Sequence, residues 1–257
     1  MTDTTRSIAV VTGAGSGIGA AIARELSGRG YTVVVTDIDY AAAAEVAGAA
    51  DFHGEALHLN VIDPDASRAV AEHVARKYGQ LDVWVSNAGI SYMQAFPDVS
   101  PEDLERTLAV NLKGPFFCGQ AAARVMIPQG HGKIIHTESM AAKAGGVEFL
   151  SDYVVSKFGV RGLTKAMARE LAKYGITVNG VCPGYVATSM QEHEVAQEAQ
   201  LRGISEEQVR ALYVADTPLG RVQTPEDVAL VVAFLAGPDS RFMTGVSVDV
   251  NGGAWME

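Results

Sequence analysis

Short runs of β-branched residues alternate with longer alanine-rich stretches along almost the whole chain. The short runs have the length and composition of buried strands, and the longer stretches have the composition of helices. Seven strands are predicted in this way: Ile8–Thr12, Tyr31–Asp37, Glu55–Asn60, Leu81–Ser86, Lys133–Glu138, Ile176–Val181 and Val246–Val250. Regular strand–helix alternation implies right-handed crossovers, so we expect a doubly wound α/β fold with a seven-stranded parallel sheet and helices on both faces.

Helix-start signals lie between the predicted strands. Asp63-Pro64, Ser100-Pro101 and Thr224-Pro225 each place a capping side chain before a proline at the first helical position. No linker, repeat or low-complexity tract divides the chain, and the strands continue nearly to its C-terminus. Residues 1–257 are therefore predicted to form a single domain.

One segment breaks the alternation. Residues 188–217 are polar and helical in pattern, and they include Ser205-Glu206-Glu207-Gln208, the sequence of a capping box. The segment follows the carboxyl end of a predicted strand, where open α/β sheets bind ligands. We therefore expect a helical lid over a substrate site, with a surface hairpin that has no function as the alternative.

Charge and composition narrow the class of protein. The chain carries 30 Asp and Glu against 20 Lys and Arg, a formal net charge of −10, and no basic cluster, which disfavours nucleic acid as a partner. Its longest apolar run, Val228–Ala236, is far shorter than the roughly twenty residues that span a bilayer, so no membrane partner is expected. Ser7–Thr12 lead into a glycine cluster without a cleavage-like site, which favours a cytoplasmic chain.

Cysteines and histidines suggest no metal site. Cys118 and Cys182 are far apart in the sequence, so they indicate neither a disulfide scaffold nor a thiolate site, and we expect both to be inert core residues. The six histidines have no ligand-like spacing. We therefore expect no catalytic metal.

A glycine-rich segment follows the first predicted strand and opens the first helix. It runs Thr12-Gly13-Ala14-Gly15-Ser16-Gly17-Ile18-Gly19, and glycines at such a turn let backbone N–H groups approach a pyrophosphate. Asp37 ends the second strand, where a carboxylate accepts hydrogen bonds from both adenosine ribose hydroxyls and repels a 2′-phosphate. Ser16 and Ile38 offer no basic group to such a phosphate. The pattern favours NAD, while a plain tight turn and a strand-end cap are the alternatives.

Together with further motifs, this segment resembles the short-chain dehydrogenase/reductase family, in its branch of single-domain enzymes. The resemblance covers essentially the whole chain, and the order and spacing of the motifs carry it. Beyond Thr12–Gly19, the motifs are Asn60-Val61, Asn87-Ala88-Gly89, Asn111, Ser139, Tyr153-Val154-Val155-Ser156-Lys157 and Pro183-Gly184. The resemblance implies a Rossmann fold, an NAD-dependent oxidoreductase acting on an alcohol or ketone, and a homotetramer.

Hydride transfer between an alcohol carbon and a nicotinamide requires a base for the hydroxyl proton and a donor for the developing alkoxide. Tyr153 is the candidate base, and Lys157, one helical turn later, is expected to lower the phenol pKa from about 10 and to hold the nicotinamide ribose. Ser139 is expected to hydrogen-bond the substrate oxygen. The resemblance implies that Asn111 holds a water molecule, which connects Lys157 to solvent. The purely structural alternatives are that Tyr153 and Lys157 form a pair on a helix face, that Ser139 is a cap and that Asn111 is a buried amide.

The resemblance also implies further cofactor contacts. The residues expected to flank the adenine, line the ribose and nicotinamide, and meet the carboxamide and diphosphate are Asn60, Val61, Asn87, Ala88, Gly89, Pro183, Gly184, Val186 and Thr188. Two positions depart from the family pattern. Glu138 replaces a small residue before the serine, and Asn251 replaces an aspartate before the two C-terminal glycines. Because strand side chains alternate, Glu138 is expected to point away from Ser139.

The predicted substrate is a small polyhydroxylated alcohol, either a sugar alcohol or a vicinal diol. The segment 188–217 and the C-terminal residues 252–256 resemble those of polyol and diol dehydrogenases. An acidic lid, with no basic residue from Thr188 to Leu201, is expected to disfavour anionic substrates. The pocket walls around Ser139 and Tyr153 are expected to be Gln94, Glu148, Phe149, Tyr185, Met190 and Trp255.

Two other functions stay open. A 3-oxoacyl thioester reductase would dock an acidic carrier through a basic patch, and Lys133 and Lys173 offer only a weak one. A catalytically silent NAD-binding regulator would not need Ser139, Tyr153 and Lys157 to be intact.

Overall fold

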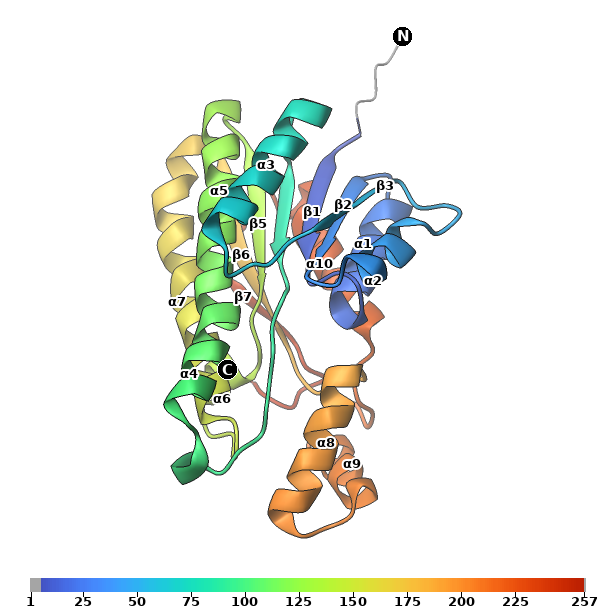
Figure 1. The fold of residues 1–257 in the computed structure, drawn as a ribbon, viewed down its shortest axis with the longest axis vertical. Coiled ribbons are helices and arrows are strands. Elements are labelled where there is room, and N and C mark those ends of the chain that lie inside the picture. The colour runs from blue at the N-terminus through green and yellow to red at the C-terminus, as the bar shows by residue number, and fades with distance from the viewer. Residues whose placement is uncertain (1–5, 257) are drawn as a thin grey trace.

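A seven-stranded sheet in which every neighbouring pair is parallel forms the centre of the computed structural model, which describes residues 6–256 (Figure 1). The sheet order is β3-β2-β1-β4-β5-β6-β7. The strands are β1 (Ile8–Thr12), β2 (Thr32–Asp37), β3 (Gly54–His58), β4 (Val83–Ser86), β5 (Gly132–Thr137), β6 (Ile176–Pro183) and β7 (Ser247–Val250). The predicted fold class is confirmed, and each predicted strand end lies within two residues of the observed one.

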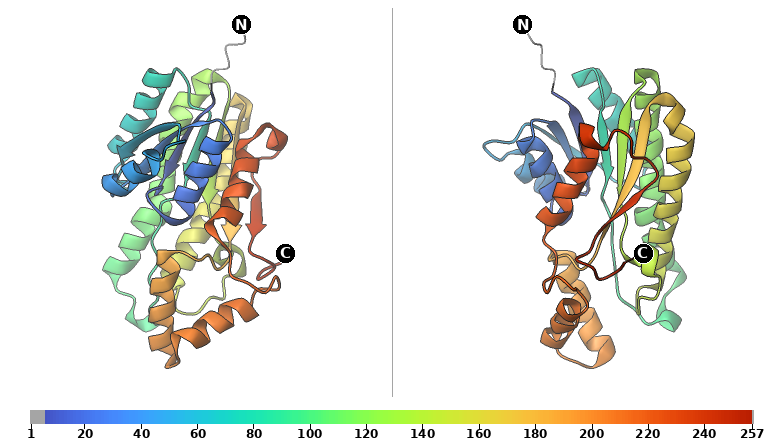
Figure 2. Two further views of the ribbon diagram at one scale, coloured as in Figure 1. Left: turned by 90° about the vertical axis from the view of Figure 1, so that its right-hand side faces the viewer. Right: turned by 180° about the vertical axis from the view of Figure 1, so that it is seen from behind.

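Helices cover both faces of the sheet (Figure 1, Figure 2). One layer consists of α1 (Gly17–Gly28), α2 (Tyr40–Ala47) and α10 (Pro225–Ala236). The opposite layer consists of α3 (Pro64–Tyr78), α5 (Gly114–Gln129) and α7 (Ser151–Leu171). Shorter helices, α4 (Pro101–Leu108) and α6 (Ala141–Ala144), lie near the carboxyl ends of the strands. This is the doubly wound arrangement that the alternation of strands and helices predicts.

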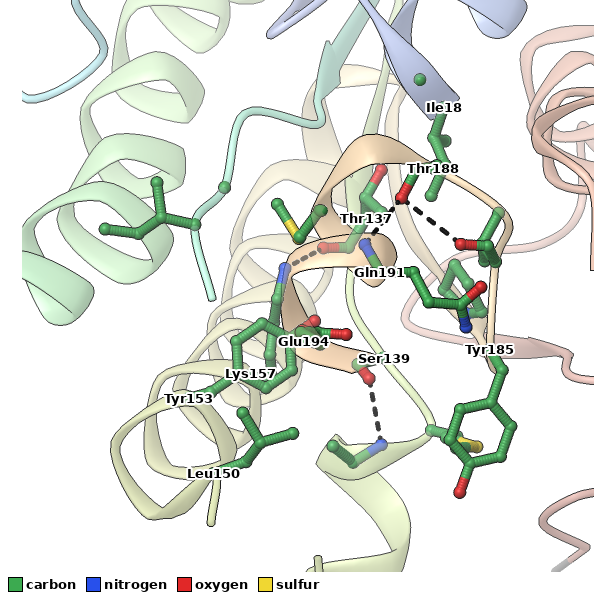
Figure 3. A pocket seen from close by; sticks show the side chains of 18 of the residues that line it. Ile18, Thr137, Ser139, Leu150, Tyr153, Lys157, Tyr185, Thr188, Gln191 and Glu194 are labelled. Atoms are coloured by element: carbon green, nitrogen blue, oxygen red, sulfur yellow. Dashed lines mark hydrogen bonds between the residues drawn. The ribbon is translucent and has the colours of Figure 1, made fainter. Parts of the chain in front are cut away.

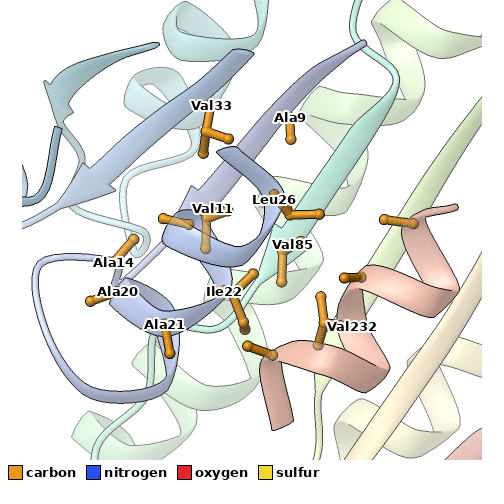
Figure 4. Packing of buried hydrophobic residues seen from close by; sticks show 14 of the residues in the cluster. Ala9, Val11, Ala14, Ala20, Ala21, Ile22, Leu26, Val33, Val85 and Val232 are labelled. Atoms are coloured by element: carbon orange, nitrogen blue, oxygen red, sulfur yellow. The ribbon is translucent and has the colours of Figure 1, made fainter. Parts of the chain in front are cut away.

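Two apolar cores fill the space between the sheet and its two helix layers. Successive residues of β1 enter them in turn, because strand side chains alternate between faces: Ala9 and Val11 join one core, and Ile8 and Val10 join the other. In the first core, Ile22 and other residues of α1 pack near Val11 (Figure 4). A strand that is buried on both faces has to be apolar along its length, which explains the composition of the predicted runs.

The predicted helix starts are confirmed by their capping bonds. The side chains of Asp63, Ser100 and Thr224 each accept backbone N–H groups at the N-terminus of α3, α4 and α10, and a proline follows each of them. Ser205 and Gln208 form the predicted capping box at the start of α9 (Glu206–Ala215). These local bonds satisfy N–H groups that a helix cannot pair internally.

Segment 188–217 is a hairpin of α8 (Ser189–Arg202) and α9, which extends beyond the carboxyl edge of the sheet (Figure 1, Figure 2). Thr188 caps α8 by accepting the Gln191 N–H group. Buried side chains of the two helices form a small core of their own: Val195, Ala199, Val209 and Tyr213. The predicted helical character of this segment is confirmed.

Among residues 6–256, no helix is both long and apolar enough to cross a membrane. The same part of the chain contains no group of three or more His, Cys, Asp or Glu side chains placed to hold a metal ion. Cys118 and Cys182 are buried and free. Burial raises the pKa of both thiols, that of Cys118 to about 12, so both thiols stay protonated and unreactive at neutral pH.

Close backbone approach explains one glycine of the loop after β1. A Cβ atom on Gly19 would lie 2.2 Å from the Gly13 carbonyl oxygen and 2.6 Å from Asn87 Nδ2. That amide nitrogen donates to the carbonyl oxygens of Thr12 and Gly13, so it is not free to move away. Gly19 therefore lets α1 pack closely against the loop.

We expect Gly19→Ala to destabilise the protein by about 1–3 kcal/mol, since the added methyl group overpacks a rigid contact. Gly28→Ala, at the other end of α1, is the matched control, because a Cβ atom there meets nothing within 4 Å. We expect this control to be neutral or slightly stabilising. Thermal unfolding at one protein concentration measures both variants, and equal midpoints would contradict the packing argument.

Candidate active site

A pocket of about 860 Å³ opens at the carboxyl ends of the strands. Its walls come from the segments that follow β1 to β6 and from the α8–α9 lid. The strand order reverses between β1 and β4, so the connections after these two strands leave on opposite faces of the sheet. In open parallel sheets, this switch point is where ligands bind.

The glycine loop forms one end of the pocket. Gly13, Ser16, Gly17 and Ile18 line it, whereas Gly19 is buried in the contact described above. Ser16 makes no side-chain capping bond to α1, so the first N–H groups of this helix have no intrahelical or capping partner. A helix N-terminus of this kind attracts an anionic group such as a diphosphate.

Asp37 fixes the end of β2 beside this loop. Its carboxylate accepts the Gly15 N–H group at 2.9 Å and the Asp39 N–H group at 3.0 Å, and it lines the pocket next to the exposed Ile38. Asp37 is therefore a cap of the turn as well as a pocket residue. No Lys or Arg lines the pocket at this end among the described residues.

Hydrogen bonds of the segment that follows β4 connect the carboxyl ends of three strands next to the pocket. Thr12 Oγ1 accepts the N–H groups of Asn87 and Ala88, and Asn87 Oδ1 accepts the Thr137 hydroxyl. Asn87 therefore joins β1, β4 and β5 at their carboxyl ends. The other residues of the predicted cofactor site also line the pocket: Asn60, Val61, Ala88, Gly89, Pro183, Gly184, Val186 and Thr188.

Three residues with the predicted chemistry converge in the middle of the pocket (Figure 3). Tyr153 and Lys157 lie one turn apart near the start of α7, and Ser139 follows β5. Lys157 Nζ donates to the Thr137 carbonyl oxygen at 2.8 Å and lies 5.5 Å from the centre of the Tyr153 ring. The Ser139 hydroxyl faces the Tyr153 phenol and also accepts the Ala141 N–H group at 3.1 Å.

The net pKa of the Tyr153 phenol is raised, whereas the neighbouring Lys157 was expected to bring it down. Burial raises the pKa of Tyr153 above its ordinary value, the Glu194 carboxylate raises it further, and the Ser139 hydroxyl only partly opposes them. Burial also lowers the pKa of Lys157 to about 8, against the opposing charge of Glu138. Because the ammonium group is itself desolvated and bonded to Thr137, the net effect is a neutral phenol at pH 7.

Asn111 is fully buried and does not line the pocket. It lies in a π-helical turn, Ala109–Lys113, between α4 and α5. Its side-chain amide accepts the Ile90 N–H group, donates to the Ile90 carbonyl oxygen at 2.8 Å and donates to Ser156 Oγ at 3.2 Å. These bonds hold the loop after β4 against α7, directly behind Lys157.

Glu138 and Asn251, which depart from the family pattern, both have structural partners. The Glu138 carboxylate is buried and accepts hydrogen bonds from Thr164 Oγ1 and Cys182 Sγ, not from Ser139. A Cβ atom on Gly180 would lie 2.1 Å from this carboxylate, so the glycine makes room for it. Asn251 accepts the Gly253 N–H group and donates to the Trp255 carbonyl oxygen, which fixes the C-terminal segment beside the pocket.

The predicted substrate walls are only partly brought together. Glu148, Tyr185, Met190 and Trp255 line the pocket, whereas Gln94 and Phe149 do not. The Gln94 side chain hydrogen-bonds Asp103 instead. The Phe149 ring packs under the Arg202 guanidinium, 5.2 Å away. These two side chains therefore lie outside the pocket, because each contacts a partner elsewhere in the chain.

The lid contributes one residue that the sequence interpretation missed, Arg202, on the same helix face as the predicted Met190. Four positions of α8, each four residues from the next, line the pocket: Met190, Glu194, Glu198 and Arg202. Arg202 bonds Glu198 at 2.5 Å and Glu148 at 2.7 Å, so the lid is not free of cations. Arg202 lies one residue beyond the stretch that the prediction considered. The spacing of four, which places side chains on one helix face, is the signal that could have identified it.

Comparison with known proteins shows similarity along nearly the whole chain. A family model described as "Enoyl-(Acyl carrier protein) reductase" matches residues 13–254. The chain is 40% identical over 261 residues to the (3R)-3-hydroxyacyl-CoA dehydrogenase of Mus musculus, covering 97% of this chain and 96% of the relative. It is 39% identical over 252 residues to a short-chain dehydrogenase/reductase of Armillaria gallica, covering 96% and 95%.

A solved structure is also similar to this chain over nearly its whole length. The crystal structure of sorbitol-6-phosphate 2-dehydrogenase from Erwinia amylovora matches with a TM-score of 0.91 and 32% sequence identity. The match covers 97% of this chain and 100% of that structure. The similarity in fold therefore includes the strands, the helices and the pocket-forming segments described above.

Proposed function

Because the chain belongs to the short-chain dehydrogenase/reductase family, we propose that it is an NAD-dependent enzyme that interconverts a sugar alcohol or vicinal diol and its ketone. Family membership establishes the coarser activity, that of an oxidoreductase that acts on a secondary alcohol or ketone with a nicotinamide cofactor. The observation that supports the finer proposal is the carboxyl-rich lid face above Ser139 and Tyr153.

In the proposed mechanism, Tyr153 and Ser139 hold the reacting oxygen between them. Bound NAD supplies the acceptor for the hydride that leaves the carbinol carbon. During oxidation, Tyr153 Oη takes the hydroxyl proton, and the Ser139 hydroxyl donates to the same oxygen while it gains carbonyl character. During reduction, the neutral Tyr153 phenol returns that proton. The upward pKa shift of Tyr153 keeps the phenol protonated at neutral pH, as the reduction direction requires, and it makes the phenolate a stronger base for oxidation.

Lys157 and Asn111 have supporting roles in this proposal. Lys157 holds the nicotinamide ribose, and its positive charge, still present at neutral pH, stabilises the phenolate that forms when Tyr153 loses its proton. Asn111 fixes the loop beside Lys157, and we propose that a water at this position carries protons between Lys157 and solvent. The remaining cofactor contacts are assigned to the pocket residues after β1, β2, β3, β4 and β6.

The thioester alternative has support from the comparisons, since the matching family model is described as an enoyl-(acyl carrier protein) reductase. The mouse relative at 40% identity is a hydroxyacyl-CoA dehydrogenase, which acts on an anionic substrate. Of the two pocket cations among the described residues, Lys157 lies beside Tyr153. Arg202 lies at the lid side, however, and stands against four carboxyl groups: Glu148, Glu194, Glu198 and Asp216. Since two of these carboxylates already bond Arg202, we favour a neutral, hydroxyl-rich substrate.

We expect the enzyme to prefer NAD to NADP in kcat/KM, because Asp37 repels a 2′-phosphate and none of the described pocket residues beside it is basic. The double variant Asp37→Ser with Ile38→Arg is expected to erode this preference by about 10- to 100-fold, as for the loss of a hydrogen bond to a charged group. Asp39→Ser is the control, since it keeps a capping oxygen outside the pocket. Equal use of both cofactors by the unaltered protein would overturn the assignment.

Tyr153→Phe removes the phenolic oxygen and leaves the ring to pack, so we expect turnover to fall by about 10²–10⁴ while NAD still binds. In the unaltered enzyme, kcat/KM for oxidation is expected to rise between pH 6 and 8 as the phenolate fraction grows. The rise is expected to slacken above pH 8, because Lys157 loses its charge near that pH. Tyr174→Phe, outside the pocket, serves as control, and near-normal activity of Tyr153→Phe would reassign the base.

The order of substrates tests the proposed specificity. We expect the highest kcat/KM for a neutral polyol or diol, a lower value for a simple secondary alcohol, and the lowest for a polyol phosphate or a 3-hydroxyacyl thioester. The physical reason is the excess of carboxyl groups at the substrate end. A higher value for either anionic compound would refute the specificity and leave the oxidoreductase assignment intact, whereas no turnover of any alcohol would favour the regulator.

We also propose a homotetramer. Phe116 of α5 and Val155 and Phe158 of α7 are apolar and exposed on adjacent helices, which suits a contact between subunits. Gly119 and Gly159, on the same two helices, pack within the chain, against Met167 and Leu112. Light scattering is expected to give about four times the chain mass of 27.0 kDa. A mass near 27.0 kDa at working concentration would contradict this prediction.

A further inference from the structure

One lid carboxyl in the pocket has no part in the mechanism above. Glu194 lies on α8 midway between Met190 and Glu198, and all three side chains line the pocket. Its negative charge acts on the Tyr153 phenol, so the carboxyl lies on the reaction side of the lid. Figure 3 shows Glu194 between Tyr153 and Gln191, above Ser139. A substrate whose reacting oxygen contacts Tyr153 therefore lies within reach of Glu194.

The residues around Glu194 offer its carboxylate oxygens fewer hydrogen-bond donors than these oxygens can accept. Among residues 6–256, no cation pairs with it, since Arg202 bonds Glu198 and Glu148. The donor that faces it is the buried Ser91 hydroxyl, on the loop after β4. Burial and the nearby Glu198 charge raise the pKa of Glu194 despite this hydroxyl. A carboxylate can accept about four hydrogen bonds, so most of its capacity is unused.

Other residues hold the lid in place. Gln197 Oε1 accepts the Met93 N–H group at 3.0 Å, and Arg202 bonds Glu148 on the loop before α7. Thr188 caps the start of α8. Glu194 takes part in none of these contacts, and its own contact with the loop after β4, the Ser91 hydroxyl, uses only part of its hydrogen-bonding capacity.

We propose that Glu194 accepts a hydrogen bond from a second hydroxyl of the substrate, on the carbon next to the reacting carbinol, and so selects vicinal diols over simple secondary alcohols. Tyr153 and Ser139 hydrogen-bond the reacting oxygen of the substrate, which leaves the hydroxyl on the adjacent carbon to face the lid. A simple alcohol would leave the enclosed carboxyl unpaired, and that cost provides the discrimination. The inference rests on the proposed function and names the residue that determines its substrate class.

The test compares 2,3-butanediol with 2-butanol in the NAD-loaded full-length protein. In Glu194→Leu, the diol preference in kcat/KM is expected to fall by about 10- to 100-fold, mainly through the KM for the diol. The effect of the lost charge on the pKa of Tyr153 acts on both alcohols alike, so it cancels in the preference. Glu194→Gln keeps one acceptor oxygen and is expected to retain part of the preference. Glu192→Leu is the control on the same helix, because Glu192 lies outside the pocket and pairs with Arg210.

A binding measurement separates recognition from turnover. In the Tyr153→Phe background with NAD present, calorimetry is expected to show a weaker Kd for 2,3-butanediol, by the same factor, when Glu194→Leu is added. An unchanged diol preference in Glu194→Leu, or an equal loss for both alcohols, would overturn the role of Glu194 and leave the proposed function standing. If the unaltered enzyme oxidises 2-butanol but does not prefer the diol, both the proposed substrate class and this inference fail.

Discussion

Burial of β1 on both faces of the sheet is the constraint on which the rest of the molecule depends. Its side chains enter two separate apolar cores, so helices have to cover both faces. Parallel neighbours on each side, β2 and β4, then require connections that leave in opposite directions. The carboxyl ends of all strands consequently meet at one edge, and the cleft at the β1–β4 reversal becomes the pocket.

The polar groups of the site are tied to backbone atoms at this edge. Asn87 joins β1, β4 and β5, Asn111 holds the following loop, and Lys157 donates to the carbonyl oxygen of the last residue of β5. Each reactive side chain is thus positioned by an element that the packed sheet already holds rigid. The geometry needed for proton and hydride transfer follows from strand packing, because strand ends move less than free loops.

The lid supplies the acidic wall of the pocket. One face of α8 places carboxyl groups above the reaction centre and a guanidinium farther along the helix, beside Glu148. The cation is neutralised by two carboxylates, so the face as a whole is acidic. In the proposed function, catalysis and substrate choice thus reside in different parts of the structure, the first on the sheet edge and the second on a helical hairpin with its own small core.

The sequence by itself determined the strands, the proline-preceded caps of α3, α4 and α10, the glycine turn and the order of the motifs, because these depend on side-chain period and on neighbours a few residues away. Most of the predicted cofactor residues could be named from those motifs. Only the tertiary structure decided that Gln94 and Phe149 face away, that Arg202 enters the pocket and that the pKa of Tyr153 rises. Burial and contacts between residues distant in sequence set these properties, and no local pattern encodes the desolvation of a side chain.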